Sequence, residues 1–127
     1  MTPDAAAYRA KAREDLSEAR QIVGIGLAKV AARSAYYAAF HAAEAFIVER
    51  TGKIAKTHSG LRTELARLTR DDPHIDRATT SFLAQAYKYK EIGDYGVGPD
   101  AVITLQDAEA AIDAAEAFVA QVATALT

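Results

Sequence analysis

The segment spanning residues 33–44 constrains the fold more than any other, because small side chains cover one half of it and polar side chains the other. At roughly 100° per residue, a helix through this segment lines up its polar groups along one face. These are Arg33, Tyr37, His41 and Glu44. The opposite half is an alanine wall that lets a neighbouring helix approach closely. It consists of Ala31, Ala32, Ala35, Ala38, Ala39, Ala42 and Ala43.

Size and composition predict one domain. The chain has 127 residues, 50% of them hydrophobic, which is enough for one core and too few to expect two, so we expect a single domain over residues 1–127. Its 15 Lys and Arg residues nearly balance 17 Asp and Glu residues, and a net charge of -2 provides no overall basic surface for non-specific nucleic-acid binding. No DNA partner is therefore expected. The absence of cysteine excludes disulfides, thiolate metal sites and thiol nucleophiles.

The start of the chain does not resemble a secretory leader. Its first residues, TPDAAAYRAKARED, are charged and helical in character, and no long apolar stretch follows. We expect a soluble, cytoplasmic protein with no membrane partner.

Hydrophobic periodicity predicts an all-α fold. Every long segment has the helical period, and none has the alternation of a half-buried strand. The simplest arrangement is an antiparallel bundle of four to five helices. The expected helices cover residues 3–23, 27–50, 57–71, 74–95 and 104–126. The last one carries a heptad-like apolar seam from Leu105 to Leu126, and both this seam and the alanine wall could serve dimerisation.

The polar face of the second helix has two interpretations. Arg33 lies one turn before Tyr37, and His41 one turn after it, so their side chains can touch. In a functional site, Arg33 would hold a phosphate or carboxylate while His41 acts as an acid, base or hydrogen-bond donor. In a structural role, Arg33 and Glu44 are partnered charges and His41 is a satisfied histidine at a helix interface. The residues alone favour the structural role.

The remaining histidines give weaker indications. His58 lies at the start of a short helix, where backbone N–H groups can bind an anion, although helix capping is the commoner role of such a polar segment. His41, His58 and His74 are too far apart in sequence to show a metal-binding spacing. Ser34 has no paired base and acid at a recognisable spacing. We therefore expect no metal, no cofactor and no nucleophilic catalysis.

A second polar constellation lies on the fourth helix. Lys90 and Asp94 are one turn apart, and Glu91 and Tyr95 form the adjacent pair. The charges either clamp the end of this helix or, with Lys88 and the tyrosines, bind RNA through phosphate contacts and stacking. Without further context the structural interpretation is favoured.

Four segments of the chain occur in a recognisable order. They are AREDLSEARQIVGIGLAKVAARSAYYAAFHAAEAFIVERTG, THSGL, YKYKEIGDYG and DAEAAIDAAEAFV. In this order they resemble the HEPN domain family (higher eukaryotes and prokaryotes nucleotide-binding) over nearly the whole chain. The resemblance is most specific at residues 35–43, and it implies an all-α bundle that commonly pairs as a homodimer.

The resemblance also implies a choice between two activities. Many members of the family are metal-independent endoribonucleases, including toxins, and carry an arginine followed four to six residues later by a histidine. A dimer sets two such motifs around one RNA-binding cleft. Here Lys90 and then Asp94-Tyr95 occupy the matching place, and no histidine follows. The chain is thus similar to the branch with a Tyr-Tyr helix and an Asp-Tyr ending that lacks the ribonuclease motif.

Two hypotheses follow from the resemblance. The first is a non-catalytic binding or regulatory protein that recognises a nucleotide, RNA or a partner protein. Family members are often encoded with a small nucleotidyltransferase, which pairs with them in toxin-antitoxin fashion and can modify a tyrosine such as Tyr95. The expected ligand-binding residues are Arg33, Tyr37, His41, Glu44, Lys90, Asp94 and Tyr95. The alternative is a divergent metal-independent endoribonuclease toxin in which His41 or His58 transfers the proton.

Overall fold

The structure is a computed structural model that describes the backbone of residues 1–127 and every side chain except those of Thr79 and Asp100. Along this described backbone the chain forms five α-helices and one short 3₁₀ helix, with no strand, which confirms the all-α prediction. The elements are α1 (Pro3–Gly24), α2 (Ala28–Thr51), α3 (His58–Thr69), α4 (Arg77–Tyr95), η1 (Pro99–Ala101) and α5 (Leu105–Ala125).

Local side-chain chemistry explains where these helices begin and end. The hydroxyl oxygens of Thr2, Thr57 and Thr104 each accept a hydrogen bond from a backbone N–H in the first turn of the helix that follows, at 3.2, 2.9 and 3.0 Å. Each bond satisfies one of the N–H groups that a helix leaves unpaired at its start. At the other end of α2, Gly52 adopts a left-handed conformation with φ of 73°, which a side chain would disfavour.

Helix α4 begins at Arg77, later than the predicted start near residue 74. The backbone N–H of His74 donates to Oδ1 of Asp72 at 2.8 Å, which holds this segment in a turn. A short aspartate side chain competes in this way with helical hydrogen bonding. The turn delays the helix and leaves a connecting segment between α3 and α4.

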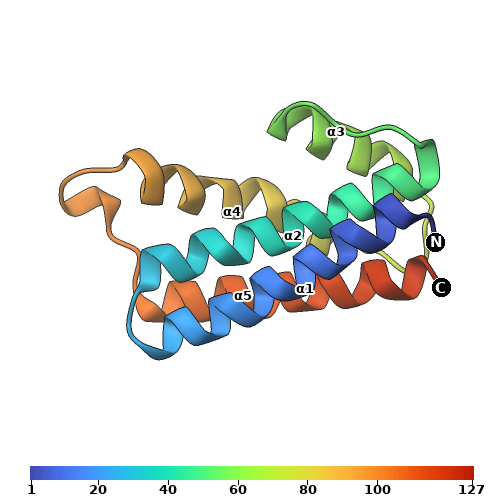
Figure 1. Cartoon of the computed structure of the whole chain (residues 1–127). Helices are drawn as coiled ribbons and strands as arrows, with labels where there is room; N and C mark the ends of the chain where they lie inside the picture. Colours follow the sequence, from blue (N-terminus) through green and yellow to red (C-terminus); the bar gives the residue numbers. More distant parts are fainter.

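Helix α2 is the centre of the bundle. Figure 1 shows it running between α4 on one side and α1 and α5 on the other, with α3 lying over its C-terminal half and both chain termini at the same end. Every alanine of the wall is at most 1% exposed. The small side chains thus let the neighbouring helices pack close to the α2 backbone, as the sequence predicts.

The alanine wall and the apolar seam are both used within the chain itself. The central residues of the seam, from Ala108 to Val122, face the core, and only Leu105 at its start is largely exposed. Dimerisation through either surface is therefore not available, because α1, α2 and α5 already bury them against one another. Within the described chain, no helix combines the length and the apolarity needed to cross a membrane.

Candidate functional site

The carboxylate of Asp94 joins the two polar faces that the sequence places on different helices. Its Oδ1 accepts a hydrogen bond from Nε of Arg33 on α2 at 2.9 Å, and its Oδ2 lies 3.0 Å from Nζ of Lys90, one turn earlier on α4. The contacts with Lys90 and then Arg33 hold the pKa of Asp94 below its ordinary value. Asp94 in turn raises the pKa of Lys90. At neutral pH the site therefore carries a carboxylate held between two cations.

Tyrosine rings extend this charged cluster. Cζ of Arg33 lies 5.0 Å from the ring centre of Tyr37, and Nζ of Lys90 lies 5.6 Å from that of Tyr95. Tyr95 is 74% exposed, so one face of its ring is open to a ligand. A cation is attracted to the face of an aromatic ring, and this attraction orients the ring. We call this surface, formed by Arg33, Tyr37, Lys90, Asp94 and Tyr95, the α2–α4 face.

A pocket of about 400 Å³ adjoins the α2–α4 face, between α1 and α2. It shares Arg33 and Tyr37 with that face, and its walls mix cationic, anionic and apolar side chains. The lining residues are Lys11, Asp15, Glu18, Ile22, Val30, Arg33, Ser34, Tyr37 and His41. Arg33, Tyr37 and His41 of the predicted polar face of α2 thus line this pocket, and Glu44 does not.

A carboxylate lies close to each ring nitrogen of His41. Nδ1 lies 2.7 Å from Oε1 of Glu44, and Nε2 lies 3.5 Å from Oδ2 of Asp15 on α1. Asp15 and Glu44 are both buried, at 6% and 8% exposure, and Lys11 closes the cluster at 3.2 Å from Asp15. The imidazole is therefore held between the two carboxylates, as in the structural interpretation of this residue.

Asp15 lines the same pocket as His41 and is not among the residues that the sequence singles out. A signal for it was present, because Asp15 lies three residues after Ala12 and four before Ala19, on the buried face of α1. A charged residue inside the apolar stripe of a helix needs a partner on the helix it packs against. On α2 that partner is His41, whose Nε2 lies 3.5 Å from the carboxylate, and Lys11 on α1 itself forms the closer ion pair at 3.2 Å.

His58 belongs to a separate, aromatic environment. Its Nδ1 lies 2.6 Å from the hydroxyl oxygen of Tyr36, and its ring packs against Phe40 and Tyr87 at centroid distances of 4.9 and 5.0 Å. Burial, and then the charges of nearby cations, lower the pKa of His58. Thr57, not His58, caps the helix.

The predicted site residues thus fall into three groups. The α2–α4 face gathers five of them, His41 and Glu44 lie beside it in the cluster with Asp15, and His58 lies apart. Among the described side chains, no three His, Asp or Glu residues are arranged to hold a metal ion. The geometry offers charge pairing, an exposed ring and a polar pocket, which suit binding of a charged or aromatic ligand.

Comparisons with known proteins agree on one family. The sequence model of the HEPN domain matches residues 5–124. The chain is 32% identical over 104 residues to a UPF0332 protein of Archaeoglobus fulgidus, a match that covers 78% of this chain and 82% of that protein. It is also similar to the crystal structure of TT1696 from Thermus thermophilus, with a TM-score of 0.82 and 26% identity over 98% of this chain and 99% of that one.

Proposed function

Because the chain belongs to the HEPN domain family, we propose that it is a binding or regulatory protein without catalytic activity, whose α2–α4 face recognises RNA or a nucleotide. Family membership supports a nucleotide- or RNA-related role in general. The finer statement, that this face is the recognition surface and performs no chemistry, is our proposal.

The observation that carries the proposal is the double engagement of Asp94. Catalytic relatives use an arginine and a histidine in this part of the fold, the first to stabilise a phosphate and the second to move a proton. Here Lys90 and Arg33 both contact the Asp94 carboxylate. A carboxylate whose pKa is lowered cannot donate a proton at neutral pH, and lysine lacks the planar fork that binds a phosphate in bidentate fashion.

The two candidate histidines also favour binding over catalysis. Each has a ring nitrogen engaged by a neighbouring side chain, His41 by Glu44 and His58 by Tyr36. A general base needs a free ring nitrogen that reaches the proton, and the second nitrogen of His41 faces Asp15 while the ring of His58 is packed among aromatic side chains. This arrangement supports a protein that binds RNA without cleaving it.

The α2–α4 face is suited to single-stranded nucleic acid. The Tyr95 ring is open for stacking with a base, and the Arg33 side chain is about half exposed, so it can reach a phosphate as well as Asp94. Base stacking on an aromatic side chain tolerates any base, and arginine supplies the phosphate contact. Recognition of this kind needs no catalytic group.

The experiment that tests this proposal measures the binding of a labelled single-stranded RNA by fluorescence anisotropy. Tyr95→Ala should weaken binding by about tenfold, since base stacking contributes about 1–3 kcal/mol. Tyr95→Phe keeps the ring and should bind like the parent protein. If Tyr95→Ala binds as tightly as Tyr95→Phe, this face is not the recognition surface.

The alternative is a divergent metal-independent endoribonuclease, and one observation favours it. Arg33 and His41 line the same pocket of about 400 Å³. Incubation of the purified protein with structured and single-stranded RNA in EDTA separates the two functions. Cleavage that disappears in His41→Ala or His58→Ala would replace the binding proposal, whereas intact RNA at high protein concentration would eliminate the nuclease.

We also propose that the protein acts as a homodimer and has a nucleotidyltransferase partner in a toxin-antitoxin-like pair. The homodimer and the nucleotidyltransferase partner are both proposed from the family resemblance. Purification from the native host, followed by mass spectrometry, tests the partner, and analytical ultracentrifugation tests the dimer. A stable monomer at high concentration would contradict a binding cleft shared between two copies.

A further inference from the structure

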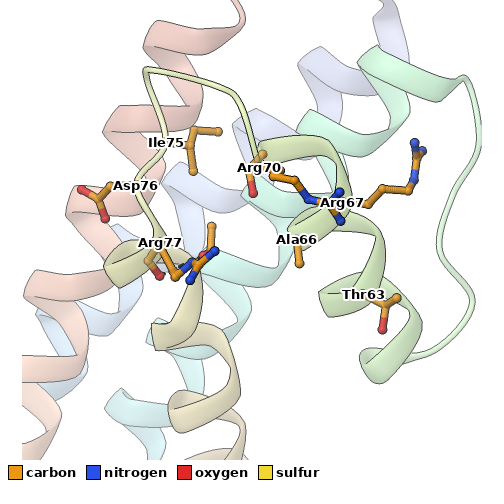
Figure 2. A pocket seen from close by; sticks show the side chains of 9 residues that line it. Thr63, Ala66, Arg67, Arg70, Ile75, Asp76 and Arg77 are labelled. Carbon is orange, nitrogen blue, oxygen red and sulfur yellow. Dashed lines mark hydrogen bonds between the residues drawn. The ribbon is translucent and has the colours of Figure 1, made fainter.

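A second polar pocket, of about 800 Å³, lies at the far end of α4 from Asp94. Figure 2 shows that it is bordered by the C-terminal end of α3, the connecting segment and the first turn of α4. Arg67 and Arg70 come from the C-terminal end of α3, and Arg77 comes from the first turn of α4. At 1.5 Å per residue, about 25 Å of helix separates Arg77 from Asp94. The pocket is therefore distinct from the α2–α4 face.

The pocket has an excess of positive charge. Arg70 and Arg77 are exposed, and neither forms an ion pair with any side chain that the structure describes. Arg67 makes a two-pronged contact with Glu64, whose carboxylate neutralises it. Three arginines thus line the pocket of a chain whose net charge is -2.

The described lining of this pocket carries one negative charge against three arginines. Among its described lining residues, the acidic one is Asp76, and its Oδ2 already accepts a hydrogen bond from Nε2 of Gln121 at 3.2 Å. The hydroxyl groups of Thr69 and Thr80 donate to helix carbonyls at 2.7 and 2.9 Å. The donors left for a ligand are therefore the guanidinium groups.

The pocket also continues along the groove between α3 and α4. A neighbouring pocket of about 330 Å³ shares Thr63, Ala66 and Thr80 with it. The second pocket adds Arg62, Leu65, Ser81 and Ala84, so that small and apolar side chains and one further arginine follow the cationic end. A ligand with an anionic group and an extended, partly apolar body would match this sequence of surfaces.

We propose that this pocket binds a phosphate ester, with Arg70 and Arg77 as the ligands of the phosphate. The planar guanidinium fork matches the geometry of phosphate oxygens, and its hydrogen bonds to an anion are stronger than those between neutral groups. Ala66 and the buried Ile75 provide apolar contacts for the organic part. The same chemistry is offered by a mononucleotide and by the backbone of single-stranded RNA.

Two probes distinguish a mononucleotide from the backbone of single-stranded RNA as the ligand. AMP is titrated by calorimetry, and a labelled single-stranded RNA by fluorescence anisotropy, each with the full chain. The test variant is Arg70→Gln/Arg77→Gln. The matched control, Arg13→Gln/Lys56→Gln, removes the same charge from exposed positions without an ion pair among the described side chains. Circular dichroism and the thermal midpoint verify that both variants fold.

We expect the test variant to bind AMP about tenfold or more weakly than the control, because each charged hydrogen bond contributes appreciably to affinity. Loss of AMP binding identifies a mononucleotide site, and loss confined to RNA identifies the RNA backbone as the ligand. A test variant that binds both probes like the control, or a parent protein that binds neither, overturns the proposal. In competition, inorganic phosphate should displace the probe from the parent protein, and failure to do so also overturns it.

The same titrations keep this site separate from the α2–α4 face. The arginine double variant should weaken AMP binding by the same factor in the Tyr95→Ala background as in the parent protein, since about 25 Å of helix lies between the two sites. If Tyr95→Ala and the arginine double variant weaken AMP binding equally and no further when combined, AMP has a single site on the α2–α4 face. That result would refute the second pocket and leave the proposed function intact.

Discussion

The hydroxyl oxygen of Tyr36 lies 2.6 Å from Nδ1 of His58, and this hydrogen bond connects the middle of α2 to the first residue of α3. Burial raises the pKa of Tyr36 and lowers the pKa of His58. Both partners are consequently neutral at pH 7. This polar contact, beside the rings of Phe40 and Tyr87, adds to the buried side chains of Leu61 and Leu65 in attaching the short helix α3 to the bundle.

Removal of this hydroxyl should destabilise the fold. Tyr36→Phe leaves the Nδ1 atom of His58 without its partner in a partly buried place, at an expected cost of about 1 kcal/mol in the free energy of unfolding. Urea denaturation measures the loss. Tyr89→Phe is the control, because the Tyr89 hydroxyl has no hydrogen bond to any described residue, and its stability should match the parent. Equal stabilities for the two variants would contradict this role of Tyr36.

Protonation of His58 should make stability depend on pH. Its pKa is about 6.5 in the unfolded chain and lower in the folded one. As pH falls through this interval, the unfolded chain binds a proton that the folded chain does not, so the free energy of unfolding decreases. Above about pH 6.5 the contribution is constant. Carboxylates with lowered pKa, such as Asp94, lose their contribution only in more acidic solution.

Denaturation near pH 7 and near pH 5.5 measures this dependence. The parent protein should lose more stability between the two values than His58→Gln, which has no titrating group at this place. The pKa of His58 itself can be followed by NMR. A value at or above that of a free histidine would refute the explanation.

His41 should be important for stability because it separates two buried carboxylates. His41→Ala leaves Asp15 and Glu44 facing each other with less compensation, at an expected cost of about 2–3 kcal/mol. His74→Ala removes an exposed imidazole and should change stability by less than about 0.5 kcal/mol. Chemical denaturation of both variants makes the comparison. Similar values for the two would show that the cluster around His41 contributes little.

The alanine wall should not tolerate larger side chains. Ala39→Leu forces a branched side chain into a fully buried helix contact, and we expect it to cost about 1–3 kcal/mol. Ala10→Leu makes the same change at an exposed position of α1, where the cost should be below about 0.5 kcal/mol. The thermal midpoint of each variant provides the measurement. An unchanged midpoint for Ala39→Leu would mean that α2 and its neighbours are not closely packed there.

Much of the fold could be predicted because its determinants are local in sequence. The helical period identifies five helices, Thr104 and Gly52 mark two of their ends, and the spacing of Lys90 and Asp94 predicts a contact that the structure confirms. Each of these depends on residues within one or two turns of one another. Such relationships hold wherever the helix lies in the bundle.

The rest of the site depends on how helices are placed relative to one another. Arg33 and Asp94 are 61 residues apart, and no sequence spacing indicates that the packing of α2 against α4 brings these two side chains into contact. The pairing of His41 with Asp15 requires α1 to pack against the matching turn of α2. The arginine pocket depends on the position of α3, which the turn at Asp72 and the Tyr36–His58 contact determine.

The alanine wall is buried inside a single chain, so folding of the chain does not depend on its association with a second copy. A protomer that buries its own small-residue surface needs no second copy to complete its core, so the monomer should stay folded when the protein is diluted. Subunits of this kind can dissociate and exchange partners without unfolding.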